Sequence, residues 1–114
     1  MPVDVAGDEI EIGEVNAAVT FWRRYRGLTG RSADEIAPGL WLPSCNCVHT
    51  FGMQTPIDLV FVGRDGRAVR VVPDVPPRRL VFGGWHAHGV LELPTGSVVE
   101  LGVTPGSRLR WHAS

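Results

Sequence analysis

The stretch Ile57-Asp58-Leu59-Val60-Phe61-Val62 decides the fold of this chain of 114 residues. It is β-branched or large and apolar at every position except Asp58, which is the composition of a buried strand. Asp65-Gly66 comes shortly after it and is a strong signal for a tight hairpin turn. Residues 68–72 then return as a second, mostly apolar run, so the sequence predicts a β-hairpin over residues 57–72.

Short apolar runs bounded by glycine and proline recur on both sides of this hairpin. A hairpin or edge strand is expected within residues 3–12, and a strand extension at residues 15–19 beyond the interruption at Gly13. Thr20 as a helix N-cap, followed by apolar residues at helical spacing, predicts a short helix over residues 20–29. One or two helical turns are expected over residues 95–102. The other predicted strands are residues 40–42, 80–82, 90–93 and 108–111.

The 14 Gly and 9 Pro argue against a helical bundle, because both residues are costly inside helices. We therefore expect a single domain over residues 1–114 that is mainly β (α+β). Its architecture would be a small barrel-like or sandwich sheet of short strands with one or two short helices.

Charge and hydropathy exclude some classes of partner. The formal net charge is -1 with acids and bases mixed along the chain, so no basic face indicates nucleic-acid binding. The first residues lack the basic and apolar regions of a signal peptide, and no apolar run approaches membrane-spanning length. We expect a cytoplasmic protein that binds neither nucleic acid nor membrane.

Residues 45–58 concentrate the chemically capable side chains, beginning with Cys45, Cys47 and His49. An extended segment would place these three on one face, where they could bind zinc or copper with Met53 as a thioether ligand. Structural zinc sites usually use four ligands and wider cysteine spacing. We therefore favour small, partly buried thiols beside a hydrogen-bonded histidine and expect no cofactor, with a metal- or thiol-dependent protein as the alternative.

Asp58 opens an apolar strand, so its carboxylate must be exposed or hydrogen-bonded. We expect it to accept backbone N–H groups from residues 50–55 or to pair with an arginine. A general base acting with His49 in a hydrolase is a weaker hypothesis, because no orienting partner or oxyanion motif is visible. Trp85 follows a Gly-Gly joint and is placed at a pocket rim, next to the pair His86 and His88.

Five ordered motifs resemble those of the domain of unknown function family 192. That resemblance implies a compact, mainly β domain with a small helical component, found in bacteria and archaea, and no established activity. Many members carry an export signal or anchor; we expect none here. Thr29 stands where the usual pattern has methionine. The motifs are Arg26-Gly27-Leu28-x-Gly30-Arg31, Val48-His49-Thr50-Phe51-Gly52-Met53-x-x-Pro56-Ile57-Asp58-x-x-Phe61, Asp65-Gly66, Val90-Leu91-Glu92-Leu93-Pro94-x-Gly96 and Gly102-Val103-x-Pro105-Gly106.

The leading functional hypothesis is a noncatalytic module that binds a small molecule or peptide through residues 45–58 and 85–88. Rigid β scaffolds commonly present binding residues on their loops, and here the loops hold the polar, sulfur and aromatic side chains. The expected ligand-binding residues are His49, Thr50, Phe51, Met53, Asp58, Trp85 and His88. The alternative metal ligands are Cys45, Cys47 and His49.

Overall fold

The computed structural model describes residues 9–17, 39–51 and 53–113. In these ranges the chain is almost entirely β, with one short helix, α3. The elements in chain order are β1 (Ile10–Ala17), β2 (Leu40–Pro43), β3 (Cys47–His49), β4 (Ile57–Gly63), β5 (Ala68–Val75), β6 (Leu80–Phe82), β7 (Ala87–Pro94), α3 (Ser97–Leu101) and β8 (Leu109–Ala113).

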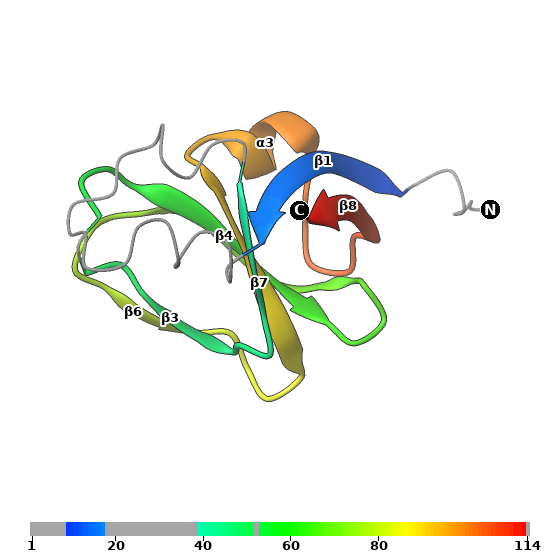
Figure 1. The fold of residues 1–114 in the computed structure, drawn as a ribbon, viewed down its shortest axis with the longest axis horizontal. Helices are drawn as coiled ribbons and strands as arrows, with labels where there is room; N and C mark the ends of the chain where they lie inside the picture. The colour runs from blue at the N-terminus through cyan, green and yellow to red at the C-terminus, as the bar shows by residue number, and fades with distance from the viewer. Residues whose placement is uncertain (1–8, 18–38, 52, 114) are drawn as a thin grey trace.

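A six-stranded sheet in the order β5-β4-β7-β2-β1-β8 forms the body of the fold (Figure 1). β4 pairs antiparallel with both β5 and β7, and β7 pairs antiparallel with β2. β1 lies parallel to β2 and to β8. β3 and β6 form a separate antiparallel pair. The six-stranded sheet does not close, although an isolated bridge joins Arg67 to Arg108 near its two ends, so the architecture is sandwich-like.

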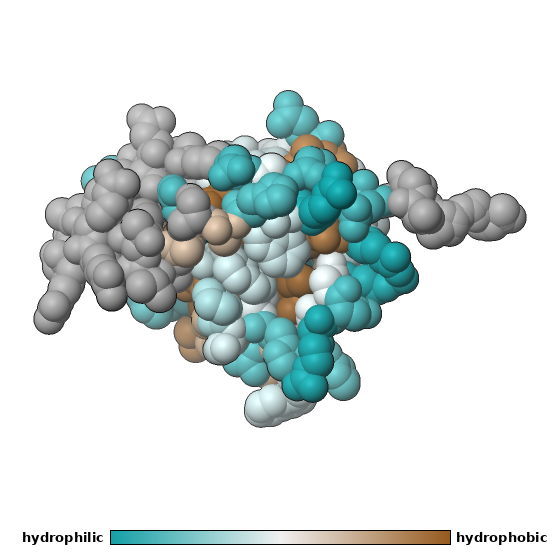
Figure 2. All heavy atoms as spheres, turned by 45° about the vertical axis from the view of Figure 1, so that its right-hand side comes forward, coloured by the Kyte–Doolittle hydropathy of each residue, from teal (hydrophilic) through white to brown (hydrophobic). Residues whose placement is uncertain are grey.

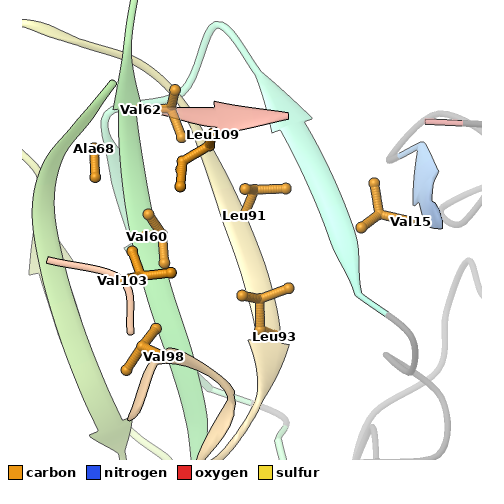
Figure 3. Packing of buried hydrophobic residues seen from close by; sticks show 9 residues of the cluster. All are labelled: Val15, Val60, Val62, Ala68, Leu91, Leu93, Val98, Val103 and Leu109. Atoms are coloured by element: carbon orange, nitrogen blue, oxygen red, sulfur yellow. The ribbon is translucent and has the colours of Figure 1, made fainter. Parts of the chain in front are cut away.

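The side chains of β4 contribute alternately to two hydrophobic clusters, because successive side chains of a strand point to opposite faces. Val60 and Val62 point into the first cluster, where Val98 of α3 and Leu109 of β8 also lie (Figure 3). These side chains converge on one another from elements far apart in the sequence, so this cluster packs α3 against the sheet and brings β8, at one end of the sheet, against β4. Its remaining buried members are Val15, Ala68, Leu91, Leu93 and Val103.

The second cluster lies on the opposite face of β4 and carries the β3–β6 pair. Ile57, Leu59 and Phe61 are all fully buried there. Val48 from β3 packs into the same cluster, and Val81 from β6 is partly buried against it. The β3–β6 pair is therefore a second layer held by its inner face. The other buried members are Met53, Val75, Ala87 and Val90.

Most of the predicted elements are confirmed. The hairpin over residues 57–72 is the β4–β5 pair, and the strands expected at residues 40–42, 80–82, 90–93 and 108–111 are β2, β6, β7 and β8. The helical turns expected from residue 95 begin at Ser97, with Gly96 as the N-cap. The helix predicted over residues 20–29 lies outside the described residues.

Gly13 does not interrupt β1, contrary to expectation. Its φ of 94° lies in the left-handed region, and the register between β1 and β8 shifts between Glu11 and Gly13. A bulge at a glycine absorbs one extra residue and lets the strand continue through it.

The β1–β8 edge is polar. Arg110 Nε donates to Glu11 Oε1 at 2.8 Å, and this bond lowers the pKa of the Glu11 carboxyl and raises that of the guanidinium. Both groups are fully exposed, so the pair contributes little to stability. Figure 2 brings this side of the molecule forward and shows mainly hydrophilic residues there. No helix in the described ranges is long and apolar enough to cross a membrane.

Candidate functional site

The two faces of the β3–β6 pair differ in what they contact. Val48 lies opposite Val81 in the register, and both side chains point inward to the second cluster. The neighbouring positions must then point outward, because strand residues alternate between faces. The outward-facing pairs are Cys47 opposite Phe82 and His49 opposite Leu80, and all four are exposed.

Five outward side chains form a nearly continuous apolar and aromatic strip, which we call the outer row: His49, Phe51, Leu80, Phe82 and Trp85. The imidazole of His49 lies 5.7 Å from the ring of Phe51, and the ring of Phe82 lies 5.0 Å from the indole of Trp85 in a T-shaped contact. Leu80 is 71% exposed and Trp85 is 83% exposed. An isolated exposed apolar residue is ordinary, whereas a contiguous group of them marks an interaction surface.

Backbone hydrogen bonds hold residues 44–46 beside residues 83–88. Ser44 donates its N–H to the carbonyl of His88 at 2.7 Å, and Gly83 donates its N–H to the carbonyl of Asn46 at 2.7 Å. These bonds place the two segments that were expected to share a surface next to each other, through Ser44 and Gly83 at their margins.

A shallow, open hollow of about 530 Å³ lies at the Trp85 end of the outer row. Arg64 Nε donates to His88 Nε2 across it at 3.0 Å, so this nitrogen of His88 is the acceptor. Among the described residues that line the hollow, none comes from residues 45–58. The two segments share the strip of the outer row instead. The lining residues are Arg64, Asp65, Val69, Trp85, His86 and His88.

Thr50 is fully buried and orders the turn that enters β6. Its hydroxyl donates to the carbonyl of Pro76 at 2.8 Å and accepts the N–H of Arg79 at 2.8 Å. Its backbone N–H donates to the carbonyl of Arg79, and its carbonyl accepts the N–H of Arg78. Arg78 has a φ of 66°, an uncommon conformation for a residue other than glycine. Thr50 therefore positions residues 76–79 by hydrogen bonding, from beneath the surface.

Replacing Thr50 with valine should lower the free energy of unfolding by about 1–3 kcal/mol, because two partly buried hydrogen bonds, from the N–H of Arg79 and to the carbonyl of Pro76, would be lost. Valine keeps the shape of the side chain, so the loss reports the hydroxyl. Urea unfolding followed by circular dichroism measures it, with Thr104→Val at an exposed site as the control. Equal stability of the two variants would show that the hydroxyl of Thr50 is dispensable.

Asp58 is fully buried and accepts two backbone N–H groups. Its Oδ1 accepts from Asp74 at 2.8 Å and its Oδ2 accepts from Val98 at 2.9 Å. Backbone N–H groups bind Asp58, as expected, but the donors come from β5 and α3, not from residues 50–55. Since Val98 belongs to the first cluster, the carboxylate lies on the opposite face of β4 from the outer row. A closed contact of this kind argues against Asp58 as a general base with His49.

Met53, Cys45 and Cys47 differ in how far their side chains are buried. Met53 is buried in the second cluster. Cys45 packs partly against that cluster and donates its thiol to the carbonyl of Cys47 at 3.1 Å, while the Cys47 side chain is exposed. Both are free thiols. Across the described residues, no three His, Cys, Asp or Glu side chains are grouped to hold a metal ion, so Cys45, Cys47 and His49 do not form such a group.

Three residues of interest were missed from the sequence. Leu80 and Phe82 supply the middle of the outer row, and their alternation about Val81 was the available signal. Glu92 is only 1% exposed in β7, opposite Leu40 and Leu59. A carboxylate inside the apolar run at residues 90–93 was the signal for it, because a charged side chain is rarely buried.

Comparison with known proteins gives one family match and two similar solved structures. The family model for DUF192, described as an uncharacterized ACR, matches residues 3–111. A proposed transcription regulator from Sinorhizobium meliloti 1021 is 25% identical, with a TM-score of 0.63 over 84% of this chain and 78% of that chain. A protein of unknown function from Novosphingobium aromaticivorans DSM 12444 is 23% identical, with a TM-score of 0.57 over 82% of this chain and 70% of that chain. No curated protein matches significantly.

Proposed function

This chain belongs to the DUF192 family of uncharacterised proteins, and from that premise we propose that it is a noncatalytic binding domain whose small-molecule or peptide ligand contacts the outer row. The family and its solved neighbours supply a fold and no reaction. The function must therefore be argued from the surface of this chain.

The observation that carries the proposal is the exposure of the outer row on a layer whose inner face is already buried. Leu80 and Trp85 are mostly exposed, although Val48 and Val81 anchor the same two strands in the core. The outward side chains are therefore not needed to hold the layer in place. Aromatic side chains gathered on a rigid strand pair and the residues beside it offer large contact area at low entropic cost, which is typical of binding surfaces.

The proposed site is narrower than the set expected from sequence. His49, Phe51, Trp85 and His88 remain in it because they are exposed. Leu80 and Phe82 join them. Thr50, Met53 and Asp58 support the site from inside the fold.

Nucleic acid is not among the ligands that we propose. The Sinorhizobium meliloti protein is described as a proposed transcription regulator, but a net charge of -1 gives no reason to assign nucleic-acid binding to this chain.

We propose that the protein is cytoplasmic. Two free thiols one residue apart suit a reducing compartment.

The proposal predicts where ligands bind. Screening ¹⁵N-labelled protein by NMR against a fragment library and a pool of short peptides should perturb amides of residues 47–51 and 80–88. Leu80→Ser and Trp85→Ser should each weaken a validated hit by about tenfold or more, because each removes large apolar contact area. Both should leave the unfolding midpoint nearly unchanged, because surface substitutions rarely cost much stability.

Val99→Ser is the matched control, since Val99 is 79% exposed but lies on α3, away from the outer row. It should leave hits unaffected. Hits that map elsewhere, or that bind the Leu80 and Trp85 variants as well as the wild type, would contradict the proposed site.

A further inference from the structure

We propose that the occupant of the outer row is an acidic peptide segment carrying aromatic or aliphatic side chains. This inference rests on the proposed binding function and specifies the chemistry of the ligand. It follows from two arginines at the Trp85 end of the row, from the absence of ion pairs to them among the described residues, and from the geometry of the two strands.

Two arginines lie at the Trp85 end of the outer row. Arg70 Nη1 donates to the carbonyl of Phe82, which places that guanidinium against β6. Arg64 lines the hollow beside Trp85. A ligand lying along the row would therefore meet guanidinium groups where the apolar contacts end beside Trp85.

Neither guanidinium takes part in an ion pair within the part of the chain that the structure describes, where the ion pairs use Arg67 and Arg110. Asp65 also lines the hollow, but its carboxylate lies 3.7 Å from Arg67 and pairs with that arginine. An apolar strip that ends at two such arginines is complementary to a ligand that combines apolar groups with carboxylates, since arginine binds carboxylates with two parallel hydrogen bonds.

The strip has the geometry of an extended peptide. Leu80 and Phe82 project from alternate positions of β6, about 6.5–7 Å apart. An extended peptide presents alternate side chains at the same spacing, so successive apolar groups can lie along the row. The hollow beside Trp85 has room for a single side chain or a terminal carboxylate against Arg64. A concave end of this kind suits a peptide better than the flat surface of a bilayer.

The test is a selection of random short peptides displayed on phage, performed on the full chain. Enriched peptides should be rich in Asp and Glu beside Phe, Tyr, Trp or Leu. A synthetic copy of the most enriched peptide should bind about tenfold more weakly to Arg64→Glu and to Arg70→Glu. Its affinity should also fall as salt rises from about 50 to about 500 mM, because salt screens exposed charges.

Arg108→Glu is the matched control, because Arg108 is an equally exposed arginine beside β8. It should leave peptide affinity unchanged, and circular dichroism should show all three variants folded. Enrichment without acidic residues, or equal losses in all three variants, would overturn this inference while leaving the binding function intact. Cosedimentation with phosphatidylglycerol vesicles that depends on Arg64 and Arg70, without acidic peptide enrichment, would overturn it in favour of a membrane surface. Trp85→Ser tests the proposed function separately. Peptide enrichment on this variant that equals enrichment on the wild type would contradict binding at the outer row, whatever the arginine variants do.

Discussion

Replacing Asp58 with alanine is expected to lower the free energy of unfolding by about 3–5 kcal/mol, because one buried and one partly buried N–H group would lose a charged acceptor. The two donors, Asp74 and Val98, lie far apart in the sequence and come from different elements. One carboxylate thus joins β4, β5 and α3.

Each hydrogen bond satisfies a group that the local backbone leaves unpaired. Val98 is in the first turn of α3, where N–H groups have no helical acceptor, and the N-cap Gly96 offers no side chain. Asp74 lies where the β4–β5 register shifts and has a φ of 55°. Its own carboxylate accepts the hydroxyl of Thr95 at 2.8 Å, which ties the bulge to the segment that leads into the helix.

Asp58→Asn removes the negative charge of the side chain while keeping its shape. An asparagine amide can accept only one of the two N–H groups and presents an NH₂ donor to the other, so a loss of about 2–4 kcal/mol is expected. Urea unfolding measures both variants, with Glu100→Gln on exposed α3 as the control. If Asp58→Asn were as stable as the wild type, the carboxylate would not be what joins the three elements. The outer row should keep its ligand preference in any folded fraction, because Asp58 faces away from it.

The sequence predicted the elements of the fold better than their connections. The hairpin of β4 and β5 was predictable because its signals are local: an apolar strand, Asp65-Gly66, and a returning strand. The parallel pairing of β1 with β2 and β8 was not, because it joins opposite ends of the chain and depends on packing. The donors to Asp58 were hidden for the same reason, since they are 16 and 40 residues away.

The sequence did not show which of the expected site residues share a surface. Residues 44–46 bond to residues 83–88, yet Thr50 and Met53 point inward while His49 and Phe51 point outward. Sequence could not decide between the faces, because both sides of β3 carry residues that suit either environment. The register with β6 decides it, and β6 is a run of only three apolar residues whose partner could not be read from sequence.

Replacing Gly83 with alanine is expected to cost about 3 kcal/mol, because the added methyl group would collide with the ring of Phe61. A Cβ built at Gly83 lies 2.0, 2.3 and 2.6 Å from three atoms of that ring. Phe61 is fully buried in the second cluster and cannot move aside without disturbing its neighbours. Overpacking of a dense core typically costs about 1–3 kcal/mol, and a contact this close lies at the upper end. Gly83 also lies between Phe82 and Trp85, so the strain would displace the outer row.

A double-mutant cycle tests the steric cause of this loss. Phe61→Leu removes part of the ring, so Gly83→Ala should cost at least about 1 kcal/mol less in that background than in the wild type. Gly63→Ala is the control, since its Cβ would come no closer than 3.1 Å to Val69, a partly exposed side chain that can shift. Full additivity of the Phe61 and Gly83 substitutions would show that the ring is not the obstacle. Coupling between them would show that the close approach of Gly83 to Phe61 sets how β6, and with it the outer row, lies over β4.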